Sequence, residues 1–254
     1  MVVSQMKALL INRKQNIFFI IGIVIILLIW LGISLVNENI FFPSIKDVSI
    51  DLYNLITEWN NLFIILLTII KVVILIIVSF VISIVLAVIS YKFMSFRSII
   101  SPMIAIMRST PVASVILVLI LLVGSKIAPF IISLLVIIPI AYENIYSAFM
   151  GIQSELIDET RLVSNINLKI ILTLYIPITF NYLLSSLLTC FGLTLKVLVM
   201  SEVLTQGNMT IGGKIQIAKS TIDITRVFSW SIVLVVIVLI VEMIIKRINK
   251  KIQN

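Results

Sequence analysis

Long apolar runs separated by short polar segments dominate the chain. A helix crosses the hydrocarbon core of a bilayer with about 20 mostly apolar residues, so each run is long enough to span a membrane. We therefore expect an all-α integral membrane protein of about six transmembrane helices, with residues 1–254 forming a single membrane domain. The runs are Ile17 to Val36, Leu62 to about Tyr91, Ile99 to Val123, Pro129 to about Ala148, Ile178 to about Val203 and Val227 to Ile245.

Two of the segments depart from a plain apolar span. The third run contains Arg108 and then Pro111, and proline removes a backbone donor and kinks a helix. We interpret Pro111 and Pro139 as packing kinks rather than ligand contacts. The polar stretch 37–61 is acidic and is expected to contain a turn and a short amphipathic piece.

The basic residues predict the orientation of these spans. Lysine and arginine gather before the first run and in the C-terminal tail, and Lys92 and Arg97 follow the second run; cytoplasmic segments carry such an excess. We therefore expect both termini and the segment 149–177 to be cytoplasmic. Residues 37–61 and 206–226 are expected to face outward.

The composition narrows the functional class. Hydrophobic residues make up 61% of the chain and charged residues 12%, against about 25% charged in soluble domains. The net charge of +8 is scattered over loops and tails, which favours membrane topology over nucleic-acid binding. The chain has no histidine, and its one cysteine, Cys190, is interpreted as a small core residue. Gly212-Gly213-Lys214 does not form a P-loop, so we expect no ATP site of that type. Neither a paired-carboxylate site nor a Ser/His/Asp arrangement can be assembled, so we expect no enzyme.

The segment 149–177 carries the most informative polar pattern. Leu156 and Val163 recur at helical spacing, while Asp158 and Glu159 share another face with Glu155. The pattern predicts an amphipathic cytoplasmic helix. Its acidic face is either a solvated surface or a docking surface for a partner subunit.

The same segment resembles the permeases of binding-protein-dependent ABC importers. The stretch from Glu155 to Arg161 is similar to their Glu-Leu-x-Glu-Ala-Ala-Arg helix, and Ile176-Pro177 stands where they have Leu-Pro. Ser164 replaces the family's glycine. The resemblance implies a loop that couples the chain to an ATPase, with the site residues Glu155, Leu156, Asp158, Glu159, Arg161, Ser164 and Pro177.

Further stretches resemble the nitrate, sulfonate and taurine branch of that family. Residues 108–113 look like its Arg-Ser-x-Pro-x-Ala element, and Pro139-Ile140 with Asn144 looks like its Pro-Ile-x-x-Asn stretch. Residues 192–212 are similar to its fifth span and outer loop. The resemblance covers about residues 62–242.

The resemblance implies a permease subunit of an ATP-driven importer in a bacterial cell membrane. It would pair with a second copy of itself, two ATPase subunits and an external substrate-binding protein. ATP and Mg²⁺ would be used by the ATPase, with no cofactor on this chain. The solute would be small, either a nitrate-, sulfonate- or taurine-like anion or another small organic compound.

Two other classes remain open. A secondary transporter or channel would be driven by an ion gradient and would carry ion sites near the midplane and inverted repeats. A membrane scaffold or a membrane enzyme would need neither ion sites nor inverted repeats. We find no such repeats, and the segment 149–177 does not favour a scaffold.

Charged residues within the apolar runs are the candidates for a translocation path or gate. Charged groups are costly in hydrocarbon, so they line water, pair or snorkel. Glu202 would either pair with an external lysine or gate the path. The hydroxyls of Ser185, Ser186 and Thr189, with Gly192, are interpreted as close helix packing. The path candidates are Lys71, Arg108, Lys196 and Glu202.

Overall fold

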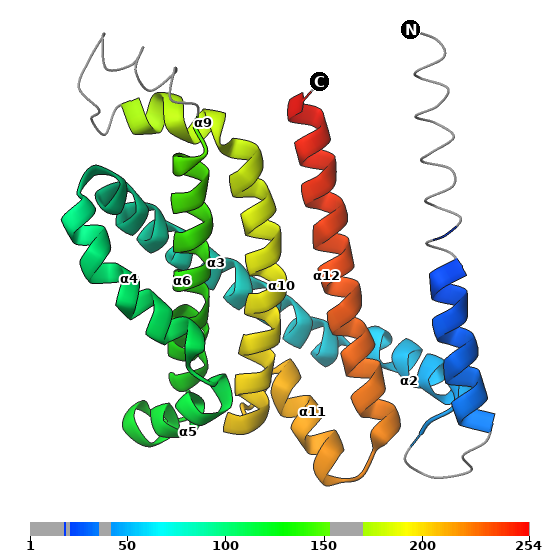
Figure 1. The fold of residues 1–254 in the computed structure, drawn as a ribbon. Coiled ribbons are helices and arrows are strands. Elements are labelled where there is room, and N and C mark those ends of the chain that lie inside the picture. The colour runs from blue at the N-terminus through cyan, green and yellow to red at the C-terminus, as the bar shows by residue number, and fades with distance from the viewer. Residues whose placement is uncertain (1–17, 19–20, 36–41, 153–169, 254) are drawn as a thin grey trace, which may run out of the picture.

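A computed structural model describes residues 18, 21–35, 42–152 and 170–253, and every regular element in these ranges is helical. A first apolar helix, Ile21–Leu35, stands beside the remaining helices (Figure 1). The others are α2 (Ile45–Thr57), α3 (Trp59–Lys92), α4 (Met94–Ser109), α5 (Val112–Val123), α6 (Ala128–Met150), the π-helical turn η1 (Ile171–Tyr175), α9 (Ile176–Ile178), α10 (Phe180–Thr205), α11 (Ile211–Ser220) and α12 (Ile224–Gln253).

The membrane-spanning class predicted from the sequence is confirmed. Four described helices are long and apolar enough to cross a membrane, namely α3, α6, α10 and α12. The pair α4 and α5 makes a fifth if it is counted as one broken span, and Ile21–Leu35 is a shorter apolar helix. Each of the four long helices overlaps a predicted run.

The third predicted run is divided into two helices by a sharp bend. Its first helix starts at Met94, earlier than the expected Ile99, and α4 and α5 then meet at 98°. Thr110 and Pro111 between them are extended, and the ring of Pro111 fixes its φ at −69°. The predicted kink at Pro111 is therefore a full break. Pro139 differs, because α6 continues through it from Ala128 to Met150.

Small side chains allow α3 to pack against α6. Ser79, Ser83, Ala87 and Ser90 are buried along α3, and small residues let membrane helices approach closely. Ser83 donates to the backbone oxygen of Ile138 at 3.0 Å, and the Tyr142 hydroxyl lies 3.0 Å from Ser90 Oγ. The same buried cluster includes Cys190 of α10, as expected for a core residue.

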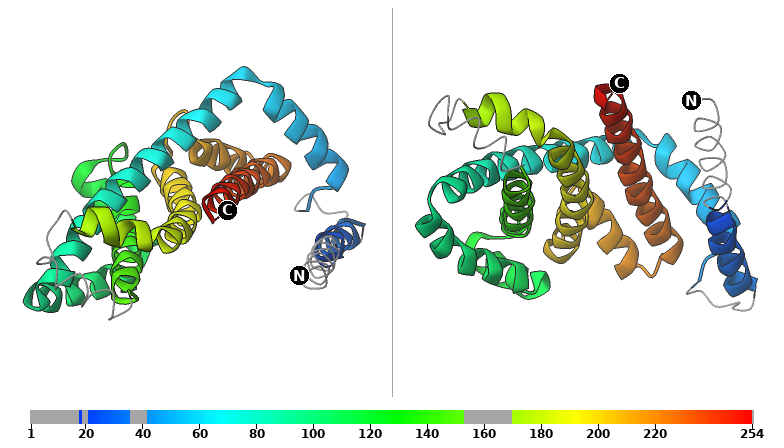
Figure 2. Two further views of the ribbon diagram at one scale, coloured as in Figure 1. Left: turned by 90° about the horizontal axis from the view of Figure 1, so that it is seen from above. Right: turned by 45° about the horizontal axis from the view of Figure 1, so that its top comes forward.

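The helices define two ends of the molecule, named here the α9 end and the α11 end. Figure 1 shows α9 and the C-terminal end of α12 at one end, with α5 and α11 at the other, and Figure 2 gives the views from above and tilted. The amphipathic piece expected within 37–61 is α2, which begins at the N-cap Ser44 and buries Val48 and Leu55. Arg226 at the start of α12 binds Asp51 of α2 at 2.6 Å.

Candidate functional site

The exposed face of α10 is unusually polar for a membrane helix. Tyr182, Ser185, Thr189 and Lys196 lie three, four and seven residues apart, which places them on one side of a helix. The hydroxyls of Ser185 and Thr189 donate to the carbonyls one turn earlier, at 3.0 and 3.1 Å, and their oxygens can still accept. The exposed residues of α10 are Asn181, Tyr182, Ser185, Thr189, Lys196, Met200 and Leu204.

The long helices α3 and α12 expose a different chemistry. Every exposed residue of α3 from Leu62 to Val85 is apolar, and so is every exposed residue of α12 from Val235 to Ile244. Such faces suit lipid tails, whereas hydroxyls and a lysine in a span favour water or protein. Of the exposed faces of α3, α10 and α12, that of α10 is therefore the least suited to contact lipid.

A polar pocket of about 420 Å³ adjoins this face between α6 and α10. Asn144 of α6 donates to the hydroxyl of Ser186 at 3.0 Å, which ties the two helices together at the pocket. The pocket therefore extends the polar face of α10 onto α6. Its lining is Asn144, Ser147, Ala148, Gly151, Tyr182, Ser185, Ser186 and Thr189.

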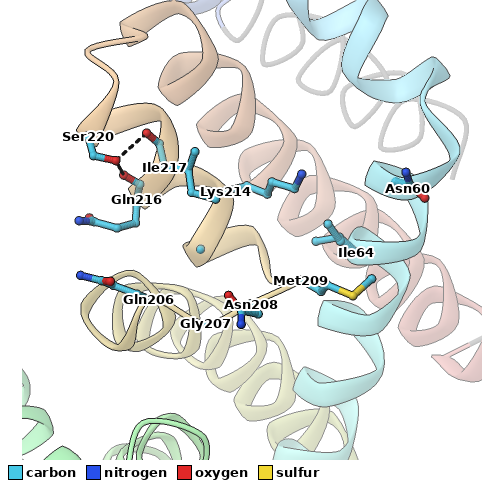
Figure 3. Close-up of a pocket in the computed structure, with 11 residues that line it drawn as sticks. Asn60, Ile64, Gln206, Gly207, Asn208, Met209, Lys214, Gln216, Ile217 and Ser220 are labelled. Carbon is cyan, nitrogen blue, oxygen red and sulfur yellow. Dashed lines mark hydrogen bonds between the residues drawn. The ribbon is translucent and has the colours of Figure 1, made fainter.

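A second pocket, of about 690 Å³, lies at the α11 end and is named here the outer pocket. Asn60 and Ile64 of α3 form one wall, and the segment 206–209 with α11 forms the other. Figure 3 shows Lys214 on α11 pointing toward the α3 wall. Amide side chains predominate among the polar groups, with Lys214 as the charged residue of the lining.

Two of the predicted path residues meet in the structure. Lys71 of α3 and Glu202 of α10 form an ion pair with 2.9 Å between Nζ and Oε1. The Glu202 side chain is 3% exposed and that of Lys71 25% exposed. Lys71 also lies over the ring of Phe130 of α6, 5.9 Å from its centroid. Glu202 thus pairs within the bundle and not with an external lysine.

The other two path candidates are not part of that pair. Arg108 is exposed in the last turn of α4, next to the break before α5. Lys196 is exposed on the polar face of α10. Among the described residues, neither has an acidic partner.

Most of the predicted coupling site lies outside the described residues: Glu155, Leu156, Asp158, Glu159, Arg161 and Ser164 all fall within 153–169. Pro177 is described and lies exposed in α9. The two flanks of the segment meet through aromatic rings. Tyr91 of α3 lies 6.0 Å from Phe149 and 5.7 Å from Tyr175 between ring centroids. This ring cluster holds the end of α6 and the end of η1 against α3.

The sequence analysis missed two features of the site and one charged residue that lines neither pocket. Ser186 is buried, in agreement with the packing interpretation, whereas Ser185 and Thr189 are exposed on this chain. The helical spacing of Ser185 and Thr189 with Lys196 was the sequence signal that could have indicated a shared polar face. Glu143, half-buried in α6, was overlooked inside an apolar run. The pairing of Lys71 with Glu202 had no local signal at all.

The comparisons with known proteins bear on these features. Residues 79–254, more than half of the chain, match the family described as "Binding-protein-dependent transport system inner membrane component". A search of curated proteins finds no match. The matched residues include α6, α10 and α12, and with them the polar face of α10. The chain therefore belongs to the family of inner membrane permease components of binding-protein-dependent ABC transport systems, and it is a multi-pass transporter subunit.

Proposed function

We propose that this chain is the permease of an ATP-driven importer and that two copies enclose a path lined by the polar face of α10. The observation that carries the proposal is the polarity of this exposed face on a helix that is long and apolar enough to cross a membrane. A second copy facing it would remove the hydroxyls and Lys196 from lipid and leave them along a shared aqueous space. The external solute would come from a binding protein, as the family implies.

We assign the α9 end to the cytoplasm and the α11 end to the outside. The basic residues support this orientation, because Lys246 and Arg247 lie near the end of α12. The segment 149–177 then faces the ATPase subunits. Its flanks are joined to α3 by the ring cluster of Tyr91, Phe149 and Tyr175. A movement of the segment on ATP binding would therefore act directly on α3 and α6.

We further propose that the solute is a small anion of the nitrate, sulfonate or taurine type. Lys196 supports this assignment, since it is exposed on the path face and has no acidic partner among the described residues. In a twofold assembly two such ammonium groups would flank the path. A passing anion would neutralise them for the time of its passage.

The lining of the path is tested by labelling single cysteines in a Cys190→Ala background. Ser185→Cys and Thr189→Cys should react with a small water-soluble maleimide in liposomes that also contain the ATPase. Val236→Cys and Leu239→Cys on α12 are the matched controls, exposed but apolar in their surroundings. Equal reactivity at the two sets of positions would contradict the path on α10.

The charge requirement is tested at Lys196. Lys196→Gln should lower ATP-dependent uptake of the anion by about tenfold or more, because the path loses its attraction for a negative solute. Lys196→Arg keeps the charge and should retain most of the uptake. If Lys196→Gln transports as well as the parent protein, this lysine does not select for anions.

A further inference from the structure

The outer pocket and the Lys71–Glu202 ion pair involve the same two helices. Ile64 of α3 and Gln206 after α10 line the pocket on its two sides. Lys71 lies two turns further along α3 than Ile64, and Glu202 lies one turn before Gln206. The ion pair therefore joins the two walls of the pocket on the side that leads into the membrane.

The wall formed by α11 is fixed to α10 beside Glu202. A Cβ added at Gly212 would lie 2.5 Å from the Cβ of Glu202 and 2.6 Å from the backbone oxygen of Val199. A Cβ at Gly213 would lie 1.9 Å from the backbone oxygen of Gly207. Because there is no space between these segments, α11 has to move with the end of α10.

The contacts of the pair make its separation unfavourable in this arrangement. The second carboxylate oxygen of Glu202, Oε2, is buried and has no hydrogen-bond partner among the described residues. Loss of the Lys71 ammonium would thus leave the buried carboxylate of Glu202 without its counter-charge. The ammonium also contacts the ring of Phe130, so it connects α3, α6 and α10 at one level.

We propose that the Lys71–Glu202 ion pair is a latch that holds α10 and α11 against α3 and closes the outer pocket on the side that leads into the membrane. Opening of the outer side separates α11 from α3, and the ion pair has to break for this to happen. Lys71 precedes residues 79–254, so this half of the latch lies outside the part of the chain that matches the family. The place of the latch in a transport cycle rests on the proposed function.

The latch is tested by the labelling rate of a reporter in the outer pocket. Gln216→Cys, in a Cys190→Ala background, reacts with a membrane-impermeant maleimide in liposomes without ATP. Lys71→Met and Glu202→Gln should each raise the rate by about tenfold, since each favours the separated arrangement. The double variant should not exceed the larger single effect, because both changes remove the same contact. Lys71→Arg should stay within about twofold of the parent, because the guanidinium keeps the positive charge and can also bind the carboxylate of Glu202.

The exposed ion pair of Lys246 with Glu242 on α12 provides the matched control. Lys246→Met should leave the rate unchanged. If both single variants label at the parent rate, or if their effects multiply in the double variant, the latch is refuted. If Glu202→Gln does not insert, the comparison of Lys71→Met with Lys71→Arg decides the question. If the Lys71 and Glu202 variants label faster than the parent, but the parent itself shows no ATP-driven uptake, the proposed function is refuted and the latch stands.

Discussion

Replacement of Gly212 by alanine tests whether α11 is seated on α10 as the structure shows. The added methyl group would lie 2.5 Å from the Cβ of Glu202, 2.6 Å from the oxygen of Val199 and 2.7 Å from the nitrogen of Val203. Two of these three atoms belong to the backbone of α10. A change of rotamer therefore cannot relieve the contact, and α11 itself has to shift.

The size of the effect follows from two opposing contributions. Overpacking of a filled site costs about 1–3 kcal/mol. Alanine in a helix is favoured over glycine by up to about 1 kcal/mol, which offsets part of that cost. Gly212→Ala should therefore destabilise the protein by roughly 1–2 kcal/mol. For a chain of this size, each kcal/mol corresponds to about 2–4 °C in Tm.

Gly192 provides the matched control, because it is also a helical glycine, in α10 itself. A Cβ there would meet only Val238 Cγ1 at 3.9 Å, an ordinary contact. Gly192→Ala should leave Tm unchanged or raise it slightly. Thermal unfolding of the detergent-solubilised protein measures both variants. If the Gly212→Ala protein is as stable as the parent, the close packing of α11 against α10 is refuted.

Two further predictions concern the segments on either side of the membrane. Asp158→Lys with Glu159→Lys should abolish co-purification of the ATPase while the protein still inserts, and Glu155→Ala should have a milder effect, because a single rim charge contributes little. If the protein with both lysine substitutions still co-purifies with the ATPase, the segment 149–177 is not the coupling element. A membrane-impermeant maleimide added outside should label Asn208→Cys and should not label Asn165→Cys. Labelling of Asn165→Cys from outside would contradict the proposed topology.

The spans could be predicted because hydropathy is a local property of the sequence. The run expected from Pro129 to about Ala148 is found as α6, which extends from Ala128 to Met150. The start of α4 was missed because Ser95, Arg97 and Ser98 make its first turns polar. The tertiary structure compensates for this polarity, since the Arg97 guanidinium binds the hydroxyl of Tyr146 and lies 4.0 Å from the centre of its ring.

The site could be predicted only in part. Lys71 and Glu202 were recognised one by one, because charged groups stand out in apolar runs. Their pairing joins positions 131 residues apart, and no periodicity within either helix reports such a contact. The two faces of α10 posed a different problem. Helical spacing places Ser185 and Thr189 on one side of α10, but it does not say which side faces the other helices. The structure shows that α6 contacts the side with Ser186 and that Ser185 and Thr189 are exposed.

Uptake by reconstituted liposomes tests the central claim most directly. Liposomes would contain this chain and the partner ATPase, with the binding protein and a radiolabelled anion outside and ATP inside. Uptake should require ATP, the ATPase and the binding protein together, and a proton or sodium gradient should not replace ATP. Uptake driven by an ion gradient in liposomes that contain this chain alone would contradict the account.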